Sequence, residues 1–151
     1  MVYNSRQQYY ATNSIYEGKV LGYLRSNKTD GTENGMSVSD NLKRGITELS
    51  LLCLLSQRDM YGYEMVQALA EYSEGNFCLQ ESSLYPTLYR LQDKKCISAR
   101  QVSAGKRRMR TYYHLEPAGK DYLQQSLREY LSVQKGFYGI LDKTGNSGDE
   151  K

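Results

Sequence analysis

The side chains best suited to do chemistry in this chain are basic, and they are concentrated in one segment. The whole chain of 151 residues carries a net charge of +3, but residues 90–110 hold eight Lys and Arg side chains against the single acid Asp93, a local charge of +7. Residues 1–40 and 117–151 are each electrically balanced. Such a block predicts a polyanionic partner, and the alternative is a basic face that meets only solvent. The eight cations are Arg90, Lys94, Lys95, Arg100, Lys106, Arg107, Arg108 and Arg110.

Other kinds of chemistry have little support in the sequence. Cys53, Cys78 and Cys96 are odd in number and include no C-x-x-C pair, so we expect buried packing residues and neither a disulfide framework nor a zinc site. His114 is the only histidine, and we expect it to be structural. A Ser-His-Asp order, a phosphate-binding glycine loop and a metal-ligand cluster are missing from the sequence, which predicts a protein that is not an enzyme and needs neither cofactor nor metal.

The chain ends are polar. Residues 1–40 are predicted to be an extension and linker with one weak helix at Ser14–Leu24, and residues 144–151 a disordered tail. An apolar targeting segment does not follow Met1, and the longest apolar run, residues 51–55, is too short to cross a bilayer. These features predict a cytoplasmic location.

Three helices are predicted to precede and enter the basic segment. The first, over 41–57, has apolar residues at i, i+4, i+7 and i+11, with an N-cap from Ser39, Asp40 or Asn41; its stripe is Leu42, Ile46, Leu49 and Cys53, widened by Leu52. The second, over 62–73, shows one apolar face of Met65, Val66, Leu69 and Ala70. The third follows Glu81 and Ser82, has Pro86 in its first turn and aligns Leu84, Leu88 and Leu91.

A β-hairpin with a basic tip and one long helix are predicted to follow. The strands are 97–102 and 109–115, and period-2 geometry places Thr111, Tyr113 and Leu115 on one face of the second. The helix over 117–141 would span about 37 Å, too long for this domain to cover its apolar stripe, so a partner helix is expected. Its predicted dimer residues are Leu123, Leu127, Tyr130, Leu131, Phe137, Tyr138 and Leu141.

This order of elements predicts a mainly α fold with a two-stranded β-hairpin. It is a winged helix-turn-helix over 41–116, followed by a dimerisation helix over 117–143. The third helix of such a fold can enter the major groove of DNA while the hairpin contacts phosphates or the minor groove. The predicted DNA-binding residues are Ser82, Ser83, Tyr85, Thr87, Tyr89, Arg90, Lys94, Lys106, Arg107, Arg108 and Arg110.

Several segments, in order, resemble the PadR-like transcriptional regulators. They are L42-K-R-G-I-T-E-L-S-L-L-C-L-L, Y61-G-Y-E-M, S82-S-L-Y-P-T-L-Y-R-L-Q and R107-R-M-R-T-Y-Y-H-L-E-P-A-G, and the resemblance covers about residues 42–123. It implies a dimeric regulator, commonly a repressor, whose last helix embraces the partner subunit and whose DNA affinity responds to a small molecule. It also assigns structural positions to Tyr113 and Gly119.

The sequence therefore predicts a homodimeric, sequence-specific regulator of transcription that binds a pseudo-palindromic operator in double-stranded DNA. A small aromatic effector could use Tyr122, Tyr130, Phe137 and Tyr138, although these rings would serve equally as interface core. The side chain of Arg90 is suited to contact either a guanine base or a phosphate. The side chains of Tyr85 and Tyr89 are suited either to contact the DNA groove or to pack against a neighbouring helix. The competing interpretation of the whole chain is a winged-helix module that binds protein instead of DNA.

Overall fold

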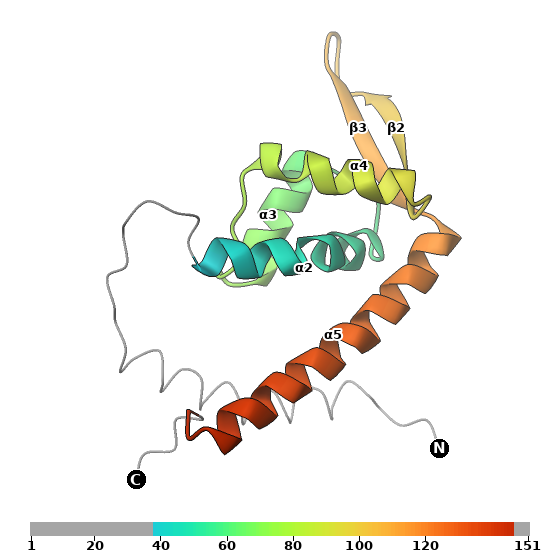
Figure 1. Ribbon diagram of the computed structural model, residues 1–151. Helices are drawn as coiled ribbons and strands as arrows, with labels where there is room; N and C mark the ends of the chain where they lie inside the picture. The colour runs from blue at the N-terminus through green and yellow to red at the C-terminus, as the bar shows by residue number, and fades with distance from the viewer. Residues whose placement is uncertain (1–37, 147–151) are drawn as a thin grey trace, which may run out of the picture. The chain divides into compact units, whose positions relative to one another are not determined.

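The computed structural model describes residues 38–146, and the helix predicted at Ser14–Leu24 lies outside this range. The described chain is mainly helical, with one small sheet (Figure 1). Its elements are α2 (Val38–Leu55), β1 (Met60–Tyr61), α3 (Gly62–Tyr72), the short 3-10 helix η1 (Glu81–Ser83), α4 (Tyr85–Asp93), β2 (Ile97–Ser103), β3 (Met109–Leu115) and α5 (Pro117–Lys143).

Helix α2 buries only part of the apolar stripe that its spacing predicts, and it buries further residues outside that stripe. Leu42 is 68% exposed, and Ile46, Leu49 and Cys53 are only partly buried. The residues buried most deeply are in the second half of the helix, at Leu51, Leu52, Leu54 and Leu55. Helix α2 is in contact with α3, α4 and β3, so more than one of its faces is covered. The helix also begins at Val38, which places the predicted caps Ser39, Asp40 and Asn41 inside it.

The second predicted helix is confirmed as α3, and its start explains the G-Y-E sequence. Glu64 Oε2 accepts a hydrogen bond of 3.1 Å from the backbone N–H of Tyr61, which satisfies a donor at the helix start. A Cβ on Gly62 would lie 3.0 Å from Glu81 Oε1 and 3.2 Å from the Tyr85 hydroxyl. Glycine at this position therefore lets the start of α3 approach the segment that leads into α4.

The sheet of the described residues has three strands, in the order β1-β3-β2, and not the two predicted. The segment between the first two predicted helices contains β1, where Met60 pairs with Tyr113 and Tyr61 with Tyr112. Two residues are too few to show an alternating pattern, so this strand forms only because β3 offers it an edge. Strands β2 and β3 form the predicted antiparallel hairpin, from Ile97↔Leu115 to Ser103↔Met109.

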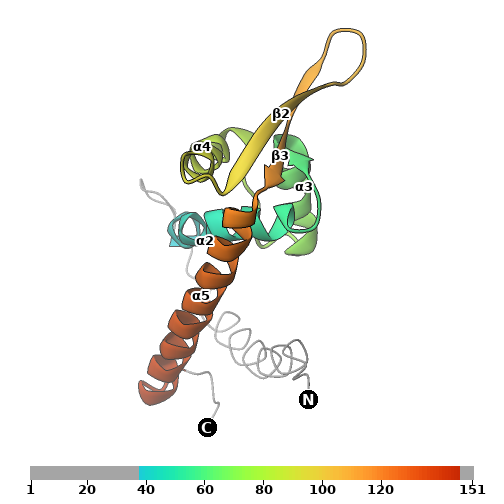
Figure 2. The ribbon, with the colours of Figure 1, turned by 90° about the vertical axis from the view of Figure 1, so that its right-hand side faces the viewer.

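The hairpin is buried at its base and exposed at its tip. Ile97, Tyr113 and Leu115 belong to the core. Of the three residues predicted to share one face of the second strand, Tyr113 and Leu115 are therefore buried, and Thr111 is partly buried. The far end of the hairpin projects beyond the helices (Figure 2). We call this hairpin the wing.

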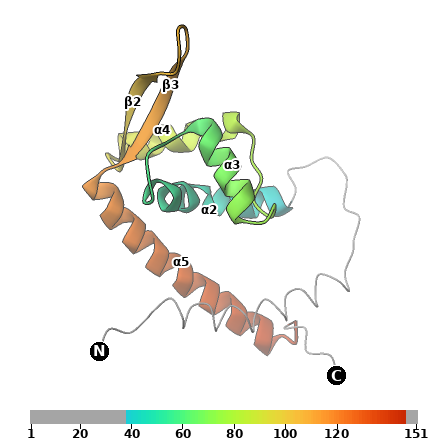
Figure 3. The same cartoon turned by 180° about the vertical axis from the view of Figure 1, so that it is seen from behind.

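The start of α5 packs on the same core as the helices. Leu123 is 5% exposed and contributes to that core, and Tyr122 and Leu127 pack against it. The prediction that Leu123 belongs to a dimer interface is therefore wrong, because its own chain already covers it. The compact winged-helix unit extends through Glu129, and α5 from Tyr130 onward belongs to a second unit. Figure 3 shows α2, α3 and α4 from the opposite side.

Candidate nucleic-acid interface

The helix predicted to read bases begins as η1 and continues as α4, and its core residues are those the sequence predicts. Leu84, Leu88 and Leu91 are fully buried, and Pro86 lies in the first turn of α4. Ser82 and Ser83 are exposed, and Tyr89 is 59% exposed. These exposed residues form the part of the helix that a groove could accommodate.

Thr87 does not belong to that exposed face. It is 5% exposed, and its hydroxyl accepts a hydrogen bond of 3.0 Å from Arg90 Nη2. Burial against the rest of the domain prevents the side chain from contacting DNA. The prediction of Thr87 as a DNA-binding residue is therefore wrong.

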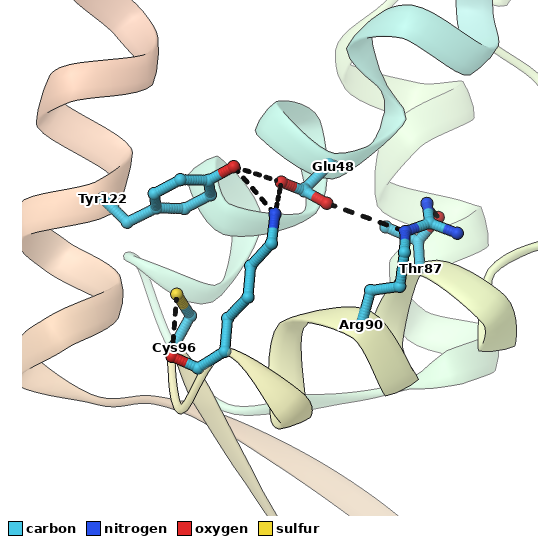
Figure 4. A network of polar contacts seen from close by, with 6 residues as sticks. Glu48, Thr87, Arg90, Cys96 and Tyr122 are labelled. Atoms are coloured by element: carbon cyan, nitrogen blue, oxygen red, sulfur yellow. Dashed lines mark hydrogen bonds and ion pairs between the residues drawn. The ribbon is translucent and has the colours of Figure 1, made fainter.

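Glu48 of α2 holds two of the predicted DNA-binding cations (Figure 4). Its Oε1 accepts hydrogen bonds from Lys94 Nζ at 2.9 Å and from the Tyr122 hydroxyl at 2.7 Å. Its Oε2 lies 4.0 Å from Arg90 Nε. Burial alone would raise the pKa of the Glu48 carboxyl, but the hydrogen bonds from Tyr122 and Lys94 and the nearby charges outweigh it and lower that pKa.

The same contacts fix Lys94. Its ammonium group donates to Tyr122 Oη at 2.9 Å and lies 4.6 Å from the centroid of the Tyr122 ring. The hydrogen bonds to Tyr122 and Glu48 raise the pKa of Lys94 against the opposing effect of burial, so it stays charged. Lys94 is thus engaged between α2 and α5, away from the part of α4 that could enter a groove.

The cations of the wing tip are arranged differently. Lys106, Arg107 and Arg108 are exposed, and within residues 38–146 no carboxylate pairs with any of them. Gly105, with φ of 94°, allows the tight turn that presents them. Much of the uncompensated charge of residues 90–110 therefore lies at the end of the wing.

Arg110 is oriented by an aromatic residue of β1. Its guanidinium lies 4.5 Å from the centroid of the Tyr61 ring, and Tyr61 in turn meets Tyr112 edge to face, with centroids 5.3 Å apart. A cation on a ring face is attracted by the negative charge of that face. Tyr61 therefore orients Arg110, which pairs with Val102 close to the turn of the wing.

A cleft with a volume of about 580 Å³ separates the wing from the start of α4. Its walls are Tyr61, Gly62, Tyr63, Glu81, Tyr85, Arg108, Met109, Arg110, Thr111 and Tyr113. The Tyr85 hydroxyl donates to Glu81 Oε1 at 2.7 Å, and this hydrogen bond, with burial, raises the pKa of Tyr85 to about 12. Because its proton is directed to Glu81, Tyr85 is less suited to donate to a phosphate than the exposed Tyr89.

The comparisons with known proteins agree with this arrangement. Residues 51–125 match the model of the Transcriptional regulator PadR-like family. A transcriptional regulator from Clostridium thermocellum superposes with a TM-score of 0.63 at 26% identity, covering 70% of this chain and 99% of that one. The chain belongs to the PadR-like family of transcriptional regulators.

Two further relatives are informative. Transcriptional regulator YqjI of Escherichia coli K12 is 28% identical over 91 residues, which is 60% of this chain and 42% of YqjI. The structure of Bacillus subtilis PadR in complex with operator DNA has a TM-score of 0.51 and 26% identity, over 54% of this chain and 47% of that one. This chain therefore matches less than half the length of each of these two.

In this PadR-like regulator, Asp59 ties the base of the wing together. Its two carboxylate oxygens lie 2.7 Å from His114 Nδ1 on β3 and 3.1 Å from Arg100 Nη2 on β2. The hydrogen bond with His114 lowers the pKa of Asp59 more than partial burial raises it, and Arg100 adds to the lowering. His114 thus has a structural partner, and Arg100 is one more cation with a carboxylate beside it.

Sequence reasoning missed the acidic and aromatic residues that hold the cations. Glu48, Asp59 and Tyr61 are distant in sequence from the cations they orient; Glu48 and Lys94, for example, are 46 positions apart. The pairing of Tyr85 with Glu81 is the exception, because residues four apart are neighbours on a helical turn. The spacing of Glu81 and Tyr85 was the one sequence signal from which such a contact could have been predicted.

Proposed function

We propose that this PadR-like regulator is a homodimeric repressor that binds a pseudo-palindromic operator in double-stranded DNA. The observation that carries the proposal is the placement of cations that pair with no carboxylate of residues 38–146. Lys106, Arg107 and Arg108 are exposed at the tip of the wing, and Arg108 lines one cleft with Glu81 and Tyr85, so phosphate contacts and base contacts would be made from adjacent elements.

The side chains indicate which residues would contact phosphates and which would contact bases. The wing cations and Arg110 would neutralise phosphates, which supplies affinity independent of sequence. Ser82, Ser83 and Tyr89 would enter the major groove, where hydroxyl groups can meet base edges. Arg90 would join them only by leaving Thr87 and Glu48. The Bacillus subtilis PadR structure, which contains operator DNA, supports this use of the fold.

Dimerisation is supported by an apolar face on the second half of α5. Val133, Phe137 and Ile140 are 72%, 55% and 59% exposed and recur at i, i+4 and i+7, so they lie on one face. Exposed apolar stripes of this kind usually mark a contact with another chain. We propose that a second copy covers them, together with the less exposed Leu127, Tyr130, Leu131, Tyr138 and Leu141.

Release by a small aromatic effector stays a prediction from the sequence and the family resemblance. Of the four rings on which it rests, Tyr122 is engaged by Glu48 and Lys94, and Phe137 belongs to the exposed stripe of α5. The proposed effector site therefore rests on Tyr130 and Tyr138, which are partly buried.

A salt-series gel shift tests the proposal. The probe is duplex DNA from the region upstream of the chain's own gene, with unrelated duplex as competitor. We expect retardation that persists in the presence of the competitor. The logarithm of the binding affinity should fall linearly with the logarithm of the salt concentration. Loss of a reporter's expression when the bound sequence overlaps its promoter would support repression, and a rise would contradict it.

Absence of retardation at low salt would overturn the proposal. It would leave the winged-helix module that binds protein as the better interpretation, because such a module needs no phosphate contacts.

A further inference from the structure

The end of α4 and the start of α5 are joined by a closed set of polar contacts. Tyr122 Oη, Lys94 Nζ and Glu48 Oε1 lie within 2.7–2.9 Å of one another, and each belongs to a different element (Figure 4). Glu48 is on α2, Tyr122 is on α5, and Lys94 is the residue that ends α4. The Tyr122 hydroxyl is the only atom of α5 in this set, where it both donates and accepts.

Backbone contacts reinforce the same junction. The N–H of Glu116 donates to Cys96 O at 2.9 Å, which ties the residue before α5 to the turn after α4. A Cβ at position 119 would collide with the same Cys96 oxygen, so the first turn of α5 lies directly on that turn. The start of α5 therefore has little freedom to slide or rotate against α4.

We infer that Glu48 and Tyr122 are positioning residues that hold the reading helix α4 at a fixed angle to the start of α5, and so set the half-site spacing that the dimer accepts. The inference rests on the proposed function, because half-site spacing has meaning only for two copies on one DNA. Two reading helices must match the separation of successive major grooves, and they reach DNA together only if each is held rigidly to the helix that joins the copies.

The network is suited to this role because it is polar and partly open. The side chains of Glu48 and Lys94 are 23% and 44% exposed, whereas the neighbouring Leu123 is buried in the core. Removing the hydroxyl of Tyr122 takes away one donor and one acceptor and leaves its ring, including the face toward Lys94. The junction would then loosen while the core remains filled.

Tyr122→Phe tests the inference through spacing selectivity. The probe is a duplex selected by the wild-type protein from a randomised library, together with versions in which the spacer is longer or shorter by one or two base pairs. One base pair rotates a half-site by about a tenth of a helical turn, so the wild type should bind the best spacer at least about tenfold more tightly than the altered ones. The variant should lose most of this ratio, mainly through weaker binding to the best spacer.

Glu48→Gln provides the second variant, since it removes the charge that holds Lys94 and keeps the side-chain shape. It should reduce the spacing ratio as Tyr122→Phe does, and the double variant should reduce it little further because both act on one network. Tyr72→Phe, which removes a phenolic hydroxyl from an exposed position on α3, should leave the ratio unchanged. Thermal melting establishes that each variant is folded.

The inference is overturned if folded Tyr122→Phe and Glu48→Gln keep the wild-type ratio, or if binding to every spacer weakens equally. A wild-type protein that binds its selected duplex without regard to spacing would overturn the proposed homodimeric operator binding, and this inference with it.

Discussion

The absence of a side chain at Gly119 allows the first turn of α5 to pack directly on the turn that follows α4. The position is buried in the first turn of α5, and the obstacle to any side chain there is Cys96 O, a backbone atom that cannot rotate away. Glycine is usually unfavourable inside a helix because it loses more backbone entropy than alanine does. At this position contact with the preceding turn outweighs that cost.

Gly119→Ala should destabilise the protein by about 3 kcal/mol, since the new methyl group must push the backbone apart. Urea denaturation followed by circular dichroism would measure the free energy of unfolding. Gly45→Ala is the matched control: nothing lies within 4 Å of a Cβ built there, and the helical site should gain up to about 1 kcal/mol. Equal stability of Gly119→Ala and wild type would contradict the packing described for this turn.

Glu48 should make stability depend on pH on the acid side. Its pKa in the folded protein is lowered by contacts with Tyr122, Lys94 and Arg90 that outweigh burial, whereas in the unfolded chain it should be about 4.3. The stabilisation is therefore fully present above the unfolded value and is lost as pH falls through the lower folded value. Wild type should be more stable than Glu48→Gln at pH 7, and the difference should shrink as the solution is made more acidic.

Thermal melting of the two proteins from about pH 7 to pH 3 would measure this difference. Glu71→Gln, at an exposed position on α3, should melt in parallel with wild type over the range. A constant difference between wild type and Glu48→Gln at all pH values would mean that the carboxylate charge is not what the network stabilises.

At the scale of elements, the wing is the part whose charge is best placed for DNA. Arg100 at its base is next to Asp59, and Arg110 lies on Tyr61, whereas the tip cations have no carboxylate neighbour among residues 38–146. Tip charges that already face water lose no protein partner on reaching a phosphate. The tip should therefore contribute more to the salt dependence of binding than its base.

Arg107→Ala/Arg108→Ala should flatten the slope of log affinity against log salt by roughly two, because two phosphate contacts no longer release counterions. Fluorescence anisotropy with the selected duplex at several salt concentrations would measure the slope. Lys120→Ala/Arg128→Ala removes the same charge from exposed positions on α5 and should leave the slope unchanged. The same slope in the wing variant as in wild type would exclude these arginines as phosphate contacts.

At the scale of the whole molecule, α5 is the element on which the proposed association of two copies depends. The first turns of α5 serve their own chain, since Leu123 lies in its core, and the large exposed apolar residues of the helix occur later, from Val133. Among the described residues, no helix is both long enough and apolar enough to span a membrane. A partner chain is the occupant we propose.

Phe137→Glu should convert the dimer to a monomer, because a carboxylate would have to be buried in an apolar contact. Sedimentation velocity would measure the molecular mass. Ser132→Glu introduces the same charge at an exposed polar position of α5 and should leave the dimer intact. A Phe137→Glu protein with the mass of a dimer would place the interface elsewhere.

The sequence by itself determined the order and kinds of most elements. Leu84, Leu88 and Leu91 mark the buried face of α4, and the alternating β3 residues mark the base of the wing, because local periodicity reports directly which side of a helix or strand is buried. The block of cations and the resemblance to PadR-like regulators were also visible in the chain. The cation block and the family motifs can both be recognised because each consists of particular residue types close together in the sequence.

Only the tertiary structure decided which cations remain available. Lys94 and Arg90 approach Glu48, Arg100 approaches Asp59, and Thr87 is buried, because packing brings together residues far apart in sequence. The strand β1 exists only where β3 offers it a partner, and Leu123 is core only because α5 begins against the turn that contains Cys96. The basic block still predicts a polyanionic partner, but its charge is presented mainly by the wing.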